Sequence, residues 1–305
     1  MGKKICDSRT WFKNEFRKNS DIHMLTDEEL KKLHDIELEM LCDFLKVVKE
    51  QNISYTMSGG SVLGTIRHGG FIPWDDDIDI NMPRKSYNRF RDIFSENLGD
   101  KYELWTPESG KDHGLSLVQI KKKGTIYQSF NELSKQDNGI CMDIFILENM
   151  PDNAVIRRIH GCICLAVGYL LTCRKTYHDL PYLEKYISDN QALKKAIMKK
   201  AQIGKLFAWI SLDKVSMLTS KVYSMCKNHN SDLVTIPSGR KHYFGEMLPR
   251  KELCESVEMD FEGIKVNIPK GYKKYMEKLY GKTYMTVPAA EDRERHPLMR
   301  IDFGG

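Results

Sequence analysis

Two aspartates stand two residues apart inside an apolar stretch, and this spacing is the strongest sign of chemistry in the chain. Asp77 and Asp79 alternate with isoleucines in the run that ends at Met82. In a β-strand, residues two apart project to the same face, so both carboxylates would point one way while the isoleucines enter the core. Such a pair can hold Mg²⁺, whose other positions go to water and phosphate oxygens. The pair predicts a metal site for a nucleotide-type substrate; the alternative is a solvated acidic turn after Pro73.

A glycine-rich turn precedes the aspartates. Gly59, Gly60 and Ser61 follow a predicted strand over Ile53–Met57 and precede apolar residues at helical spacing. Glycine lets the backbone approach an anion closely, and the amides at a helix N-terminus stabilise negative charge. The order of strand, turn and helix therefore predicts a phosphate-binding turn. A Gly-Gly pair alone is more often a plain turn, and it is the aspartate strand downstream that favours the phosphate interpretation.

Both features lie in the stretch Ser58–Pro83, SGGSVLGTIRHGGFIPWDDDIDINMP. Its glycine-serine turn and two-carboxylate strand resemble the signature of the polymerase-beta-like nucleotidyltransferase superfamily. The whole stretch closely resembles the LicD family, which includes phosphocholine transferases and is similar to fukutin and fukutin-related proteins. The resemblance implies transfer of a substituted phosphate from a CDP-activated alcohol, such as CDP-choline, to a hydroxyl of a glycan or lipid-linked glycan, with CMP leaving. Lipopolysaccharide and teichoic acid are examples of such acceptors.

The superfamily also requires a third carboxylate on a neighbouring strand. The apolar run Gly139–Leu147 is typical of a buried strand, and Asp143 inside it would be costly to bury without a metal or a hydrogen-bond partner. We therefore expect Asp77, Asp79 and Asp143 to be the catalytic carboxylates and to bind Mg²⁺ or Mn²⁺. An aspartate capped by backbone amides is the alternative. LicD-like chains usually continue into Pro-Leu-Asp, whereas this strand continues into Glu148, so a contribution from Glu148 stays open.

Substrate contacts are expected around these carboxylates. The turn would cradle the distal phosphate through Ser58, Gly59, Gly60 and Ser61. Three cationic or titratable side chains could offset charge on the transferring phosphate, although each alone is equally typical of a surface: Arg67, His68 and Lys121.

Further candidates carry less evidence. In a regular strand, Asp75 would project to the same face as Asp77 and Asp79 and could adjust the properties of the bound metal. Asp76 would point elsewhere in such a strand. The resemblance places donor contacts near the end of the chain, at Arg293, Arg295 and His296, with Tyr243 and Glu246 as weaker candidates. Trp74 and Trp105 could cap a choline-like cation, but core packing is the favoured interpretation.

Composition indicates an ordinary globular protein. The chain has 305 residues and a net charge of +5 that is spread along its length, which favours solubility and an anionic substrate over nucleic-acid binding. The N-terminal sequence lacks the apolar core of a signal peptide. The eight cysteines show no Cys-x-x-Cys pairs, so we expect reduced, mainly buried thiols rather than a zinc site at Cys162, Cys164 and Cys173. A cytoplasmic location is expected, with the inner face of the membrane as an alternative.

The order of elements predicts an α+β fold: a nucleotidyltransferase-like mixed sheet with flanking helices and an added helical module. Residues 1–150 would form the catalytic core with an N-terminal helix that begins at the Thr26–Glu29 capping box. Residues 151–230 would form the helical module, and residues 231–305 a C-terminal segment with a β-hairpin that packs on the core.

The helical module contains the longest apolar run of the chain, Ile159–Cys173. The run is shorter than the ~20 residues that cross a bilayer, so the sequence favours a buried helix. The lysines of this module are typical of a solvated face; docking on an anionic membrane surface is the alternative, which would suit a lipid-linked acceptor.

Two other functions fit the same residues. A true nucleotidyltransferase would move a nucleoside monophosphate from an NTP and release pyrophosphate, with the same metal site and fold. A catalytically silent scaffold would bind nucleotide or glycan without turnover, and the presence of all three predicted carboxylates argues against it.

Overall fold

The computed structural model describes residues 23–129, 132–134, 138–187, 191–293 and 298–304. The first half of the described chain contains a long helix, a helix after the glycine turn and most of the strands of one sheet. These elements are α2 (Asp27–Glu50), β1 (Thr56–Met57), α3 (Gly59–His68), β2 (Ile78–Pro83), α4 (Arg84–Leu98), β3 (Tyr102–Trp105), β4 (Val118–Lys122), β5 (Ile126–Ser129) and β6 (Cys141–Asn149).

The second half contains the helical module and the C-terminal segment. Its elements are α5 (Ala154–Ile187), α6 (Gln191–Leu206), α7 (Leu212–Tyr223), β7 (Leu233–Thr235), α8 (His242–Gly245), β8 (Leu248–Pro249), α9 (Arg250–Leu253), β9 (Ser256–Phe261), β10 (Ile264–Pro269), α10 (Tyr272–Tyr280), the short 3₁₀ helix Ala290–Asp292 and β11 (Leu298–Asp302).

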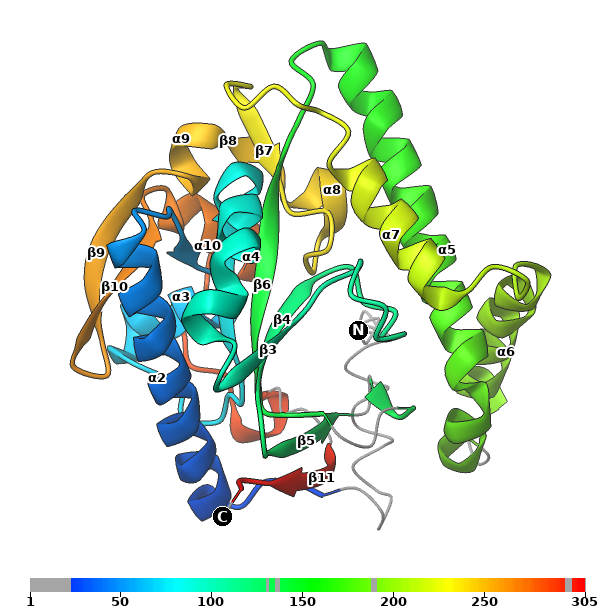
Figure 1. Cartoon of the computed structure of the whole chain (residues 1–305), viewed down its shortest axis with the longest axis horizontal. Coiled ribbons are helices and arrows are strands. Elements are labelled where there is room, and N and C mark those ends of the chain that lie inside the picture. The colour runs from blue at the N-terminus through cyan, green and yellow to red at the C-terminus, as the bar shows by residue number, and fades with distance from the viewer. Residues whose placement is uncertain (1–22, 130–131, 135–137, 188–190, 294–297, 305) are drawn as a thin grey trace, which may run out of the picture.

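The main sheet is mixed, with strand order β1-β2-β6-β4-β3. β2 and β6 run parallel, whereas β1 pairs antiparallel with β2 and β4 pairs antiparallel with β6. The far end of β6 leaves this arrangement and pairs with β7, which pairs with β8. A mixed sheet with flanking helices confirms the predicted α+β fold (Figure 1).

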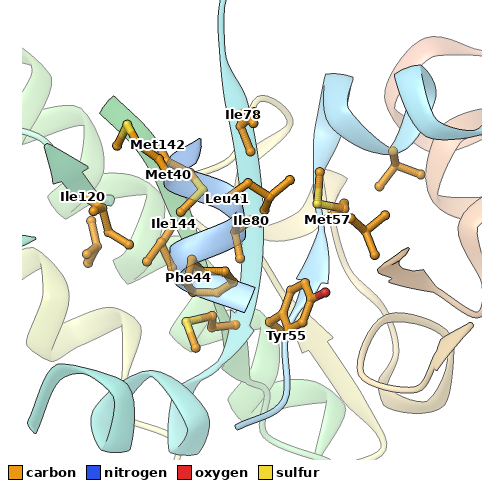
Figure 2. Packing of buried hydrophobic residues seen from close by; sticks show 14 of the residues in the cluster. Met40, Leu41, Phe44, Tyr55, Met57, Ile78, Ile80, Ile120, Met142 and Ile144 are labelled. Carbon is orange, nitrogen blue, oxygen red and sulfur yellow. The ribbon is translucent and has the colours of Figure 1, made fainter. Parts of the chain in front are cut away.

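The core lies between the sheet and α2. The capping box is present at Thr26 and Glu29, and the predicted apolar stripe of α2 is buried. Met40, Leu41 and Phe44 lie against the isoleucines of β2 and β6 (Figure 2). Because Ile78 and Ile80 face this core, the intervening Asp79 is held on the opposite face of β2.

The C-terminal segment completes the same core. The predicted hairpin is present as β9 and β10, joined through Glu262 and Gly263, and the predicted helix is present as α10. Val266, Ile268 and Met276 belong to the buried cluster that also contains β2. Residues far apart in the chain thus share one hydrophobic core, and the C-terminal helix reaches the glycine turn.

The expectation of a buried helix over Ile159–Cys173 is wrong. The run lies inside the much longer helix α5, in which Ala154–Glu184 is long and apolar enough to cross a membrane, and the most apolar 18 residues of this segment have a mean hydropathy of 1.5. Only 22% of its most apolar window is buried, because α5 stands at the edge of the molecule and packs along one side (Figure 1). The length of the apolar run did not reveal how far the helix extends or which side is covered.

The cysteines are less buried than expected. Cys164 and Cys173 are buried, but Cys42 and Cys162 are exposed, and the remaining described cysteines are partly exposed. The seven cysteines from Cys42 to Cys254 are free thiols.

Candidate active site

Asp79 and Asp143 lie side by side on the sheet. They occupy paired positions of the parallel strands β2 and β6, and Gln119 of β4 pairs with Asp143 on its other side. The backbone N–H of Ser58 donates to the carbonyl of Asp79 at 2.8 Å, which adds a fourth residue to the row. Four adjacent chain segments therefore place Ser58, Asp79, Asp143 and Gln119 in one line across the sheet.

The glycine turn sits directly against this row. The Asp79 backbone N–H donates to Ser61 Oγ at 2.8 Å, so Asp79 is held by both ends of the turn. α3 begins at Gly59 itself, with Ser58 as the N-cap, so the glycines form the first turn of the helix rather than a loop before it. The amides at this end bear the positive end of the helix dipole, which favours an anion.

A side chain at either glycine would displace a neighbouring carboxylate. A Cβ on Gly59 would lie 2.7 Å from Asp79 Oδ2, and Gly59 has a φ of +43°. A Cβ on Gly60 would lie 2.6 Å from Asp75 Oδ2. The Gly-Gly pair therefore lets two carboxylates approach the helix N-terminus, a packing role that the sequence did not predict.

The carboxylates of Asp79 and Asp143 are half-buried and lie close to other acidic groups. Burial raises the pKa of Asp79 well above its usual value, and the negative charges of Asp77 and Asp143 raise it further. Burial also raises the pKa of Asp143 to about 7, although the hydrogen bond from the Gln119 amide, at 2.9 Å, opposes this shift. Burial and the charge of Asp77 likewise raise the pKa of Glu37 on α2. Without a cation, this concentration of acidic groups favours bound protons.

The acidic groups fit a divalent cation. Asp75, Asp76 and Asp77 place carboxylate oxygens within 4.8 Å of one another. Among the residues that the structure describes, these three form the group of acidic side chains close enough together to share one metal ion. Asp77 also acts electrostatically on both Asp79 and Asp143. Hard carboxylate oxygens suit Mg²⁺ or Mn²⁺, and a dication would compensate the buried charge. The predicted metal set of Asp77, Asp79 and Asp143 stays a prediction.

Asp76 does not point away from Asp75 and Asp77 as expected, because β2 begins only at Ile78 and the alternation of a regular strand does not extend to these residues. The Asp75 backbone carbonyl lies 2.8 Å from His34 Nε2 of α2, which ties the acidic segment to that helix. Asp76 is buried and accepts a hydrogen bond from the hydroxyl of Tyr127 at 2.8 Å. The expectation that Asp75 lies with the site is consistent with its contact with Gly60.

α10 closes the site from the C-terminal segment. The Tyr275 hydroxyl lies 3.0 Å from Ser58 Oγ, so the Ser58 side chain is engaged within the protein. Burial raises the pKa of Tyr280, and the charges of Asp79 and Asp75 raise it further. Glu246 acts on Asp79 electrostatically, and burial raises the pKa of Glu246 to about 7. Glu246, a weaker candidate from the sequence, thus lies near enough to Asp79 to affect its pKa.

Cationic side chains gather around Trp74. The Arg293 guanidinium carbon lies 4.2 Å from the ring centroid and that of Arg67 lies 5.8 Å from it, while His68 contacts the ring edge-on. Arg67 also donates to the Tyr284 carbonyl at 3.0 Å and to His68 Nε2 at 2.9 Å. Burial lowers the pKa of Arg67, and Asp75 opposes that shift.

The structure therefore brings two predicted cations, Arg67 and Arg293, to one aromatic ring beside the acidic segment. Arg295 and His296 lie outside the described residues.

Lys121 points to other partners. It is buried, and its ammonium lies 3.1 Å from Glu132, 3.1 Å from Asn138 and 4.1 Å from the centre of the Trp105 ring. Its charge still reaches Asp143, whose pKa it lowers. The predicted phosphate contact thus has an internal ion pair, and Trp105 packs against this lysine as the core interpretation expected.

Glu148 forms a buried ion pair with Arg84 at the start of α4. The Arg84 side chain is 10% exposed and that of Glu148 2%, and both line a small cavity with Tyr223. This pairing accounts for Glu148 without a role beside Asp143, five residues earlier on β6.

Sequence reasoning missed several residues around the site. Gln119 lies two residues before Lys121, so both side chains project to the same face of β4, and Glu37 interrupts the apolar stripe of α2. These two patterns could have indicated polar side chains that face the interior. Tyr275 and Tyr280 gave no comparable signal, because only the packing of α10 against α3 brings them to Ser58 and Asp79.

A carboxylate pair on neighbouring strands beside a helix N-terminus is the arrangement expected of a nucleotidyltransferase-like domain. Residues 52–155 match the family model described as LicD/FKTN/FKRP, nucleotidyltransferase domain. This range contains the glycine turn, the acidic segment and the Asp143 strand. The predicted resemblance to the LicD family is therefore confirmed.

Individual relatives support the same conclusion. The chain is 26% identical over 281 residues to the lipopolysaccharide cholinephosphotransferase LicD of Haemophilus influenzae, which covers 88% of this chain and 98% of that protein. It is 34% identical over 64 residues to the human ribitol 5-phosphate transferase FKRP, covering 21% of this chain and 11% of that protein. An uncharacterized protein of Rickettsia typhi is 30% identical over 117 residues, or 38% of this chain and 30% of that protein.

Proposed function

We propose that this protein transfers a substituted phosphate, of the phosphocholine type, from a CDP-activated alcohol to a hydroxyl of a cell-surface glycan or its lipid-linked precursor. The observation that carries the proposal is the pairing of Asp79 with Asp143 beside the N-terminus of α3. Similarity to a cholinephosphotransferase over nearly the whole length of both chains supports the reaction class. We place the reaction in the cytoplasm, where CDP-activated donors would be available.

In the proposed reaction, the acceptor oxygen attacks the phosphorus that bears the alcohol. A new O–P bond forms, the bond from this phosphorus to the bridging oxygen breaks, and CMP leaves with that oxygen. Asp143 accepts the proton of the attacking hydroxyl as the general base, and the hydrogen bond from the Gln119 amide holds its carboxylate in place. The amides of Gly59, Gly60 and Ser61 bind the distal phosphate, and Arg67 and Arg293 offset its charge.

Asp77, Asp79 and Asp143 would hold Mg²⁺ or Mn²⁺, with Asp75 as a neighbour. Bound there, the ion would neutralise charge on the donor diphosphate. The protein contributes the remainder by positioning: Ser61 and Ser58 fix the backbone of Asp79, and Gln119 orients Asp143.

The test is a screen of CDP-choline, CDP-ribitol and CDP-glycerol with Mg²⁺ or Mn²⁺ and glycan acceptors, in which CMP release and acceptor mass are followed. We expect CMP and a mass gain equal to the alcohol phosphate. Pyrophosphate release from an NTP, with nucleotide attached to the acceptor, would support the nucleotidyltransferase alternative instead.

Two matched variants sharpen the test. Asp79→Asn should lower turnover by at least about a hundredfold, because it removes one of the carboxylates proposed to hold the metal ion. Asp260→Asn, on the exposed β9–β10 hairpin, should leave turnover unchanged. Full activity of Asp79→Asn would contradict the assignment of the site.

A further inference from the structure

The exposed side of α5 is almost entirely apolar over its first five turns. Eleven residues between Ala154 and Thr172 are exposed, and only Arg158 and Thr172 among them are polar. The large members are 40% to 67% exposed: Val155, Ile156, Ile159, Ile163, Leu165 and Tyr169. A contiguous apolar strip of this length on a folded protein marks an interaction surface rather than ordinary surface variation.

The opposite side of α5 is fixed to the body of the protein. His160 Nε2 lies 2.8 Å from the Val222 carbonyl and His160 Nδ1 lies 3.1 Å from the Tyr243 hydroxyl. A Cβ on Gly161 would lie 2.3 Å from the Phe244 ring, and one on Gly168 would lie 2.6 Å from the Tyr223 hydroxyl. These close contacts hold α5 against α7 and α8, and a helix that crossed a bilayer would lose them.

The charge of the surrounding module indicates what covers the strip. Residues 152–228 contain 13 Lys and Arg against five Asp and Glu, a net charge of +8, whereas the whole chain carries +5. The other 228 residues therefore carry a net charge of −3, and the positive charge is concentrated in the helical module. Exposed lysines include Lys194, Lys195 and Lys199 of α6 and Lys214 and Lys221 of α7.

We propose that α5 docks in the plane of an anionic phospholipid bilayer, with Ile156, Ile159 and Ile163 entering the headgroup–acyl boundary and the lysines of the module facing anionic headgroups. Apolar side chains and basic charge on the same module are the two attractions that an amphipathic surface helix uses. A second copy of the chain fits less well, because two modules of +8 would repel each other face to face. The proposal rests on the proposed function only in its purpose, which is to bring the site to a lipid-linked acceptor.

Vesicle flotation of the full-length protein tests the proposal without donor or acceptor, so its outcome is separate from that of the activity assay. We expect flotation with vesicles of phosphatidylcholine containing about 30% phosphatidylglycerol and little with phosphatidylcholine alone. Salt of roughly 0.5 M should weaken the binding, because it screens the lysines.

Three variants separate the contributions. Replacing Ile156, Ile159 and Ile163 by serine should weaken binding at least about tenfold, because their apolar surface no longer leaves water. Serine at Met285 and Val287, which are 49% and 48% exposed outside the module, is the matched control and should bind as the unchanged protein does. Glutamate at Lys194, Lys195 and Lys199 should abolish the preference for anionic vesicles.

Three outcomes would overturn the proposal. One is equal binding by the triple serine variant, with its fold verified by circular dichroism. Another is a dimer in solution that the same variant dissociates, which would show that a second copy covers the strip. The third is membrane-bound protein that alkaline carbonate does not extract, which would show that the helix spans the bilayer.

Discussion

Asp79 and Asp143 are paired across the parallel strands β2 and β6, and both residues are half-buried. Because strand pairing fixes the register of their backbones, the two side chains leave the sheet at neighbouring positions. The pair therefore couples the charge state of the site to the stability of the fold.

The first prediction concerns pH. The pKa of Asp143 is raised from 3.8 to about 7 in the folded protein, so the folded state binds this proton more tightly than the unfolded chain. Its contribution to stability is present below about pH 4 and is lost as the pH rises to about 7. The metal-free protein should therefore melt at a lower temperature at pH 8 than at pH 5, measured by calorimetry.

The control for this prediction is Asp143→Asn, whose melting temperature should fall less between pH 5 and pH 8 than that of the unchanged protein. Mg²⁺ should raise the melting temperature of the unchanged protein more at pH 8 than at pH 5, since it binds ionised carboxylates. An equal effect of Mg²⁺ at both pH values would contradict a carboxylate metal site.

The second prediction concerns the glycine turn. Gly59→Ala should lower turnover at least about tenfold, because the new Cβ displaces the Asp79 carboxylate. Gly69→Ala is the matched control: Gly69 has a φ of +70° but no atom within 4 Å of its Cβ position. Both variants should lose about 1 kcal/mol from backbone strain, measured by urea unfolding, and only Gly59→Ala should lose activity. Equal activities would mean that contact with Asp79 is unimportant.

The third prediction concerns Gln119. Its amide donates to Asp143 Oδ1 and lowers the pKa of that carboxyl. Gln119→Leu should therefore raise the pKa, and the acid limb of the pH–rate profile should move to higher pH by on the order of one unit. Gln128→Leu, whose amide donates to the Leu133 carbonyl instead, should leave the profile in place. A lower rate with an unshifted profile would assign Gln119 a packing role alone.

The fourth prediction concerns Glu148 and Arg84. Glu148→Ala should destabilise the protein by roughly 3–5 kcal/mol, because it leaves the Arg84 guanidinium buried without its partner. Replacement of both residues by leucine and methionine should recover much of this loss, and turnover per folded molecule should be unchanged. If Glu148→Ala instead keeps its stability and loses turnover, Glu148 acts in the reaction.

The sequence predicted well those elements whose signals are local. The capping box at Thr26 and Glu29, the turn at Glu262 and Gly263, and the alternation around Asp79 each depend on residues a few positions apart. Hydrogen bonds and side-chain periodicity within one element decide these features, so a linear reading captures them. The choice of Asp143 came from resemblance to a family combined with one polar residue in an apolar run.

Tertiary structure alone decided the rest. Contacts between residues distant in the chain bring Gln119 to Asp143, Glu37 to the acidic segment and Tyr280 to Asp79. The exposed side of α5 was hidden for a related reason: both sides of this helix are apolar, so periodicity could not show which side the protein covers. Local chemistry determined what each segment would form, and packing between segments determined which side chains meet and which face outward.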